Sequence, residues 1–232
     1  MPNYVVPPLD VTVLPVVGMD AYFPVRRVFA IGQNYAEHVV ELGGVPEKKT
    51  PLFFTKPADA VVPEGGDVPY PPMSNDVHHE LEMVVALKEG GSDIPVEDAE
   101  RRIFGYATGI DFTRRDLQFE CKKKGRPWDV AKAFDHSAPV SAITPIEQSG
   151  PMLSGGIHLS VNGEVRQDGD LKDMIWSVNE IISELSRYFE LKAGDLIFTG
   201  TPSGVSAIHE GDEILGQIDG LQSISCRILG TA

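Results

Sequence analysis

The clearest helical pattern in the chain covers residues 171–189. Its apolar residues recur at three- and four-residue steps, at Ile175, Val178, Ile182, Leu185 and Phe189. This spacing places them on one face of an α-helix, from which they can pack against a core. Gly194 follows closely and ends the pattern. We therefore predict one substantial helix over residues 171–189.

The patterns elsewhere are shorter and typical of strands. Apolar residues alternate with polar ones or run together, between turns rich in glycine and proline, at 80–87, 104–112, 196–199, 213–218 and 223–229. Short helices are predicted at 35–42 and 95–103. Strands outnumber helices and do not alternate regularly with them. The pattern therefore predicts a mixed, strand-rich α+β fold rather than a doubly wound sheet.

The length of 232 residues fits one domain. Several prolines lie within residues 1–24, and proline removes a backbone donor and disfavours helix in the residue before it. We predict an extended N-terminal lead-in over 1–24. Since no repeat, low-complexity tract or linker divides the remainder, we predict a single domain over 25–232.

The charge limits the partners. Twenty basic and 34 acidic residues give a formal charge of −14, which repels nucleic-acid phosphates and anionic lipids, so we expect neither nucleic acid nor a membrane as partner. No apolar run approaches the ~20 residues that cross a bilayer, and residues 1–20 lack the basic start of a signal peptide. Cys121 and Cys226 are too few for a disulfide framework. We expect a cytoplasmic protein.

Three carboxylates are candidates for a metal site. Glu80 and Glu82 lie two apart in a predicted strand, so their side chains leave the same face about 7 Å apart. Asp111 lies near the end of the predicted strand 104–112. Carboxylate oxygens are hard ligands that suit Mg²⁺ or Mn²⁺. The alternative is that Glu80 and Glu82 form the solvated face of an amphipathic strand.

A histidine and a glutamate offer acid–base chemistry. His38 and Glu41 are three residues apart in a predicted helix and so share one face. A carboxylate beside an imidazole orients it as a general base that can take a proton from water. A surface contact between the two side chains is the alternative.

The segment 111–132 differs in charge from the rest of the chain. It holds seven basic and four acidic residues, a local charge of +3, whereas the remainder carries −17. Such a patch can attract an anionic substrate, although a solvated helix face also explains it. The chain lacks G-x-S-x-G, H-E-x-x-H and a Walker A loop, which argues against serine hydrolases, zincins and P-loop proteins.

Several motifs in order resemble the fumarylacetoacetate hydrolase family. They are I-G-Q-N-Y-A-E-H-V-V-E at 31–41, H-H-E-L-E at 78–82, G-I-D-F-T-R-R-D-L-Q at 109–118, K-A-F-D at 132–135 and T-G-T-P-S-G-V at 199–205. The resemblance covers about residues 23–230. Within the family, the chain is similar to the short bacterial fumarylpyruvate hydrolases through F-P-V-R-R at 23–27, K-P-A-D-A-V at 56–61, G-R-P-W-D at 125–129 and N-G-E-V-R-Q at 162–167.

The resemblance implies a fold, an assembly and a set of site residues. The fold is a mixed β-sandwich roll with a few short helices, usually a homodimer, in which 25–232 is the catalytic domain. The implied metal ligands are Glu80, Glu82 and Asp111, with Lys132 as a cation at the metal edge; His38 and Glu41 form a catalytic dyad on a lid helix, and Arg115, Gln118 and Thr201 contact the substrate. Gln33 stands where the family usually has arginine. If that arginine serves the site electrostatically, the change affects substrate preference or lid docking; if it makes a structural surface contact, little changes.

The implied activity is hydrolysis of the C–C bond of an acylpyruvate, a small anionic 2-keto acid. The expected reaction converts fumarylpyruvate to fumarate and pyruvate, in the breakdown of aromatic compounds such as gentisate. The alternatives are an oxaloacetate decarboxylase or a general acylpyruvase of the same family. A metal-binding protein without turnover is a different class, against which the dyad argues. The cations that could meet the second carboxylate of fumarylpyruvate are Arg26, Arg114, Lys122 and Arg126.

Overall fold

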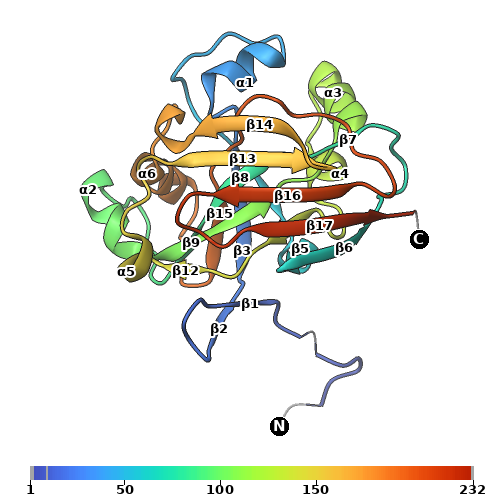
Figure 1. Ribbon diagram of the computed structural model, residues 1–232. Helices are drawn as coiled ribbons and strands as arrows, with labels where there is room; N and C mark the ends of the chain where they lie inside the picture. Colours follow the sequence, from blue (N-terminus) through green and yellow to red (C-terminus); the bar gives the residue numbers. More distant parts are fainter. Residues whose placement is uncertain (1–2, 9, 231–232) are drawn as a thin grey trace.

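Two β-sheets pack face to face in the computed structural model, which describes residues 3–8 and 10–230. The smaller sheet has the order β14 (Glu164–Asp170), β13 (Gly156–Val161), β16 (Glu213–Ile218), β17 (Ile224–Leu229), β6 (Gly65–Pro69). It crosses the front of Figure 1, with the larger sheet behind it. Both sheets mix parallel and antiparallel pairs, since β6 pairs parallel to β17 and β3 parallel to β15.

The larger sheet carries the candidate carboxylates. Its order is β4 (Leu52–Lys56), β3 (Arg27–Gly32), β15 (Asp195–Phe198), β8 (Leu81–Leu87), β9 (Ile103–Ile110), β11 (Ala138–Val140), β5 (Val61–Pro63), with β12 (Thr144–Pro145) also on β9. Two small pairs complete the strands, namely β1 (Val13–Pro15) with β2 (Tyr22–Pro24), and β7 (Val77–His78) with β10 (Thr113–Arg114). This arrangement confirms the predicted α+β sandwich roll of the fumarylacetoacetate hydrolase type.

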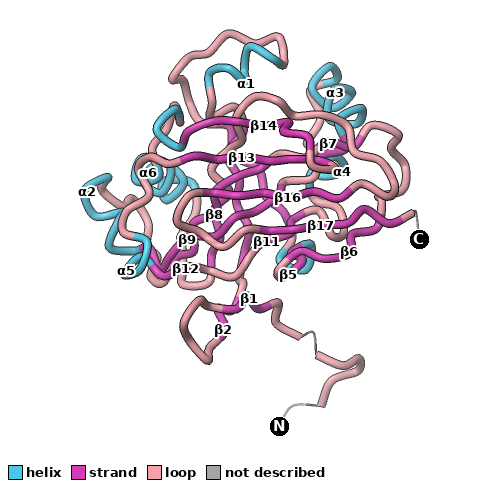
Figure 2. Tube along the Cα trace, in the orientation of Figure 1, coloured by secondary structure: helices cyan, strands magenta, loops and turns pink. Residues whose placement is uncertain are grey.

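The helices are short and lie around the edges of the sheets (Figure 2). They are α1 (Ala36–Glu41), α2 (Val96–Ala99), α3 (Arg115–Lys124), α4 (Asp129–Lys132), α5 (Ile146–Ser149) and α6 (Val178–Tyr188), with 3₁₀ turns at Ala58–Ala60, Glu100–Arg102 and Leu171–Asp173. In the described part of the chain, no helix is both long and apolar enough to cross a membrane.

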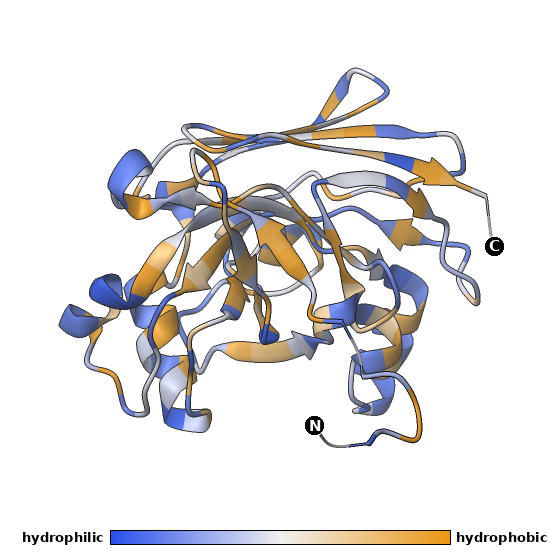
Figure 3. Ribbon diagram, turned by 90° about the horizontal axis from the view of Figure 1, so that it is seen from below, coloured by the Kyte–Doolittle hydropathy of each residue, from blue (hydrophilic) through white to orange (hydrophobic). Residues whose placement is uncertain are grey.

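The core explains why β8 is buried at every position. Met83 and Val85 join the apolar cluster between the two sheets, whereas Val84 and Ala86 belong to a second cluster on the opposite face of the larger sheet. Figure 3 shows the hydrophobic residues concentrated on the strands. The second cluster includes Leu14, Val16 and Phe23, so the β1–β2 hairpin covers that face. The division of the chain at residue 24 stays a prediction.

The predicted helix over 171–189 is wrong at its start. A 3₁₀ turn occupies Leu171–Asp173, and α6 begins only at Val178. Ser177 and Glu180 form a capping box that starts the helix there. Before it, residues 174–177 do not continue a helix, and Asn34 binds this part of the backbone: the Asn34 carbonyl accepts from the Ile175 N–H, and the Asn34 side chain exchanges two hydrogen bonds with Trp176.

Candidate active site

The three candidate carboxylates meet inside the protein. Glu80 precedes β8, Glu82 lies on it, and Asp111 follows β9, the antiparallel neighbour of β8. The Asp111 N–H donates to the Glu80 carbonyl at 2.8 Å. One oxygen from each carboxylate lies within 4.8 Å of the other two, and all three residues are buried. The alternative of a solvated strand face is therefore wrong.

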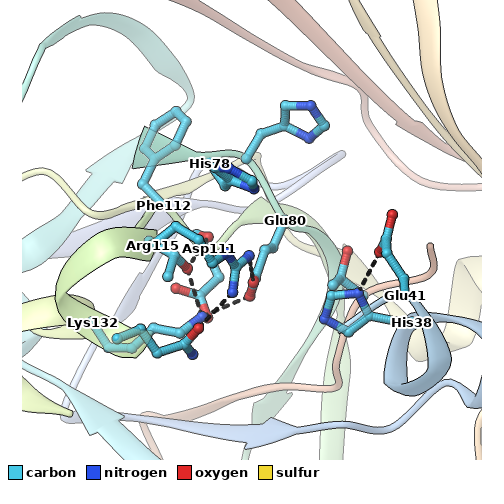
Figure 4. A network of polar contacts seen from close by, with 12 residues as sticks. His38, Glu41, His78, Glu80, Asp111, Phe112, Arg115 and Lys132 are labelled. Carbon is cyan, nitrogen blue, oxygen red and sulfur yellow. Dashed lines mark hydrogen bonds and ion pairs between the residues drawn. The ribbon is translucent and has the colours of Figure 1, made fainter. Parts of the chain in front are cut away.

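Two cations from the segment 111–132 pair with these carboxylates (Figure 4). Lys132 on α4 places Nζ 2.6 Å from both Glu80 Oε2 and Asp111 Oδ2, and also donates to Thr113 Oγ1. Arg115, the first residue of α3, contacts Glu80 Oε1 and donates to Gln118 Oε1 at 2.6 Å. Burial opposes charge on Lys132, but Asp111 and Glu80 outweigh it and raise the Lys132 pKa.

Sequence analysis missed a third cation, Lys56, as a site residue. It ends β4 and is buried, with Nζ 2.7 Å from Asp111 Oδ1. Lys56 donates to the carbonyls of Phe112, Ser137 and Lys132, so Asp111 Oδ1 accepts no well-aligned hydrogen bond. Burial lowers the Lys56 pKa, and Asp111 opposes that shift. The only signal in the sequence was the motif K-P-A-D-A-V at 56–61, which begins with this lysine and does not indicate which carboxylate Lys56 contacts.

Within the described part of the chain, the cations around the cluster pair with Glu80 and Asp111 and leave Glu82 without a partner cation. Burial disfavours charge on Glu80, but Lys132 and Arg115 hold its pKa well below the usual range. Burial and the negative charges of Asp111 and Glu80 instead raise the Glu82 pKa well above normal. Among the residues described, the Glu82 side chain accepts a hydrogen bond only from the Gly200 N–H, at 2.6 Å. An unpaired buried carboxylate beside two others fits a hard divalent cation, Mg²⁺ or Mn²⁺.

The dyad lies on α1, next to this cluster. His38 Nδ1 is 2.9 Å from Glu41 Oε2, and Glu41 Oε1 accepts from the Gly204 N–H at 2.9 Å. Burial opposes ionisation of Glu41, yet the hydrogen bonds from His38 and Gly204 lower its pKa. The base of α1 is fixed by Asn34, whose Nδ2 donates to the Thr199 carbonyl at 2.8 Å.

One pocket brings most of the predicted site residues together. Its walls include His38, Glu80, Glu82, Arg115, Gln118, Lys132 and Thr201, together with Gln33 and Lys122. The space inside it is small, with room for the centre of about one water molecule. Gln33 sits there with a positive φ of 62°.

The four cations proposed for a distant carboxylate lie in different places. Arg26 binds the buried Asp195, and Arg114 donates to the Val130 carbonyl while stacking on Phe134. Neither of these two arginines lines the pocket, and each side chain has another partner. Lys122 lines the pocket itself. Arg126 lines a neighbouring cavity of about 410 Å³, which shares Phe54, Trp128 and Lys132 with the pocket as common walls.

Fold and site together define a class: a mixed β-sandwich roll that holds a divalent-cation site beside a histidine–glutamate pair. The chain belongs to the fumarylacetoacetate hydrolase family. A family profile described as the C-terminal part of fumarylacetoacetate (FAA) hydrolase matches residues 27–229, which confirms the resemblance read from the motifs.

The chain is similar to proteins named for two different activities, fumarylpyruvate hydrolase and oxaloacetate tautomerase. The crystal structure of fumarylpyruvate hydrolase from Pseudomonas aeruginosa, in complex with Mn²⁺ and pyruvate, is 48% identical with a TM-score of 0.95, over 98% of this chain and 99% of that chain. A fumarylpyruvate hydrolase of Ralstonia sp is 42% identical over 76% of this chain and 92% of its own. A mitochondrial oxaloacetate tautomerase of Rattus norvegicus is 43% identical over 88% and 91%.

Proposed function

We propose that this protein is a metal-dependent hydrolase that cleaves the C–C bond of an acylpyruvate, with fumarylpyruvate converted to fumarate and pyruvate. One observation carries the proposal: Glu80 and Glu82 of the buried carboxylate cluster line the same pocket as His38 of the dyad. In this proposal Glu80, Glu82 and Asp111 hold Mg²⁺ or Mn²⁺. The similarity to the Pseudomonas aeruginosa enzyme, with its Mn²⁺ and pyruvate, supports the assignment.

The charge of the site suits a small anionic keto acid. Three carboxylates face three cations, Lys56, Arg115 and Lys132, so their formal charges cancel. A divalent cation adds two positive charges in a protein whose overall charge is −14. A local positive site of this kind attracts an anion that the rest of the surface repels. We assign the contacts with that anion to Arg115, Gln118 and Thr201.

The dyad performs the proton transfers. Glu41 accepts the hydrogen of His38 Nδ1, which leaves Nε2 free to take a proton from water. The resulting hydroxide adds to the ketone carbon remote from the substrate carboxylate. The C–C bond on its pyruvate side then breaks, its electron pair forms the enolate of pyruvate, and a proton returns to give pyruvate and the second acid. A divalent cation, when bound, supplies Lewis-acid stabilisation of the developing negative charge.

Oxaloacetate tautomerase is the second candidate, because relatives with that name are 40–43% identical to this chain. The same dyad can move a proton between carbon and oxygen of oxaloacetate, which breaks a C–H bond and forms an O–H bond, or the reverse, and leaves the C–C bonds intact. Oxaloacetate decarboxylase and general acylpyruvase stay as alternatives.

Assays of the Mg²⁺-loaded protein with fumarylpyruvate, acetylpyruvate and oxaloacetate separate these activities. Hydrolysis yields two acids, decarboxylation yields CO₂, and tautomerisation changes only the enol absorbance. A protein that cleaves neither fumarylpyruvate nor acetylpyruvate would overturn the proposed hydrolase activity.

Lys122 provides a test of substrate preference. It lines the pocket, and a cation there can meet the far carboxylate of fumarylpyruvate, which acetylpyruvate lacks. A charge-assisted hydrogen bond contributes roughly 1.5–3 kcal/mol, so we expect kcat/KM for fumarylpyruvate to exceed that for acetylpyruvate by about 10- to 100-fold. Lys122→Met should remove most of this preference, whereas Lys123→Met, next in the chain but outside the pocket lining, should retain it. Equal kcat/KM values in the unaltered protein would instead favour a general acylpyruvase.

The proposal includes a cytoplasmic homodimer that acts in the breakdown of aromatic compounds, as the resemblance implies. Light scattering in solution should give twice the 25.2 kDa mass of one chain. A monomeric mass at micromolar concentration would contradict the dimer and leave the assigned chemistry in place.

A further inference from the structure

Gln167 is a buried polar residue whose side chain uses its whole hydrogen-bonding capacity. It lies on β14 and has no solvent exposure. Its Oε1 accepts from the Leu81 N–H at 3.0 Å and from His79 Nδ1 at 3.0 Å. Its Nε2 donates to Thr201 Oγ1 at 2.7 Å and to the Pro202 carbonyl at 2.9 Å. An amide offers two donors and two acceptor positions, and all four are occupied.

The backbone fixes the orientation of this amide. The Leu81 N–H can only donate and the Pro202 carbonyl can only accept, so exchanging oxygen and nitrogen would break both hydrogen bonds. The nitrogen therefore faces Thr201, and the Thr201 oxygen must accept. Beyond Gln167, the same polarity continues outward: His79 Nδ1 donates to Gln167, and His79 Nε2 accepts from Ser206 Oγ at 2.9 Å.

The acceptor role leaves the Thr201 hydroxyl hydrogen available. Thr201 Oγ1 donates to no protein group within the described residues, and its side chain lines the same pocket as His38 and Glu82. The preceding residue, Gly200, aims its N–H at Glu82 Oε2. The Gly200 N–H is thus directed at a candidate metal ligand, and the Thr201 hydroxyl hydrogen is left for an acceptor in the pocket that Thr201 lines.

We propose that Gln167 is a positioning residue that holds the Thr201 hydroxyl as a hydrogen-bond donor toward a carboxylate or 2-oxo oxygen of the bound keto acid. The inference rests on the proposed function, because it takes the pocket as the keto-acid site. It assigns a task to the last residue of the N-G-E-V-R-Q motif at 162–167, which lies on the sheet opposite to the carboxylate cluster.

Pyruvate titration of the Mn²⁺-loaded protein by calorimetry tests this inference. Gln167→Glu exchanges the donating nitrogen for an oxygen, to which the Thr201 hydroxyl then donates. We expect the pyruvate Kd to rise about 10- to 100-fold, as for the loss of one charge-assisted hydrogen bond. Thr201→Val should raise it by a similar factor. Because Gln167 acts through Thr201, the effect of Gln167→Glu should depend on Thr201. The factor by which Gln167→Glu raises the pyruvate Kd should be at least about tenfold smaller in the Thr201→Val variant than in the original protein.

The controls distinguish positioning from a structural effect. The Mn²⁺ affinity of each variant should stay within about threefold of the original protein, since the donor meets the keto acid and not the cation. Equal penalties for Gln167→Glu in both backgrounds would overturn the inference. If Gln167→Glu does not fold, pyruvate binding by Thr201→Ser and Thr201→Val provides the test. Thr201→Ser keeps the hydroxyl and should bind pyruvate nearly normally. Nearly normal pyruvate binding by Thr201→Val would overturn the inference. Absence of pyruvate binding in the original protein would count against the proposed function itself.

Discussion

The Mn²⁺- or Mg²⁺-depleted protein is expected to lose at least about 10³-fold in kcat/KM for fumarylpyruvate and to recover when either cation is restored. Lewis-acid stabilisation of developing charge contributes several kcal/mol, and each 1.36 kcal/mol changes the rate tenfold. The carboxylate cluster supports this expectation, because Glu82 lies buried beside Glu80 and Asp111 without a cation of its own among the residues described. Rates measured after chelation and after titration with each metal provide the check.

Metal binding should also be visible without an assay of activity. A ligand that binds only the folded state raises the free energy of unfolding, so saturating Mn²⁺ should raise the melting temperature. Glu82→Gln should abolish both that rise and the recovery of activity. As a matched control, Glu120→Gln changes an exposed carboxylate of α3 and should leave the response to metal unaltered. Full activity of rigorously metal-free protein would refute the assigned site.

His38→Ala is expected to lower kcat for hydrolysis by about 10³- to 10⁴-fold, at the upper end of what a general base contributes. The pyruvate and Mn²⁺ affinities should change little, because the base acts on water and not on the bound end of the substrate. Glu41→Gln should cost less, about 10²-fold, since the imidazole remains and loses only its orientation and charge partner. Single-turnover kinetics together with pyruvate titration separate these effects.

Glu37→Gln is the matched control for the dyad. Glu37 lies on the same helix as the dyad, and its side chain accepts from Ser203 Oγ at 3.2 Å outside the pocket. The kcat of Glu37→Gln should therefore stay within about twofold of the kcat of the original protein. Near-normal turnover of His38→Ala would refute the dyad. If oxaloacetate conversion survived in His38→Ala while acylpyruvate cleavage vanished, the two reactions would share the metal and use different bases.

Local rules were sufficient for part of this site. The spacing of His38 and Glu41 predicted a shared helix face, and their side chains are 2.9 Å apart. The two-residue spacing of Glu80 and Glu82 predicted that they leave one face of the chain together. The order of short motifs indicated the family and with it the fold, because a series of motifs in order is far more specific than any one of them. Such features depend on neighbours in sequence.

The remaining features depend on packing between distant segments. The sequence could not indicate that β4 places Lys56 against Asp111, or that Gln167 on the opposite sheet holds Thr201. Both contacts join segments far apart in the sequence, and no periodicity encodes them. The same reason explains the error at the start of α6, because Asn34 binds the backbone before this helix.

The amino-acid sequence by itself determined the family, the strand-rich α+β class and the residue types of a candidate metal site of carboxylates beside a candidate histidine base. Tertiary structure alone decided the balance of charge within that site. Glu80 is paired with Lys132 and Arg115, whereas Glu82 has no cation among the residues described. The physical reason is that the cost of a buried charge depends on what lies within a few ångströms of it, and the fold of the whole chain sets those distances.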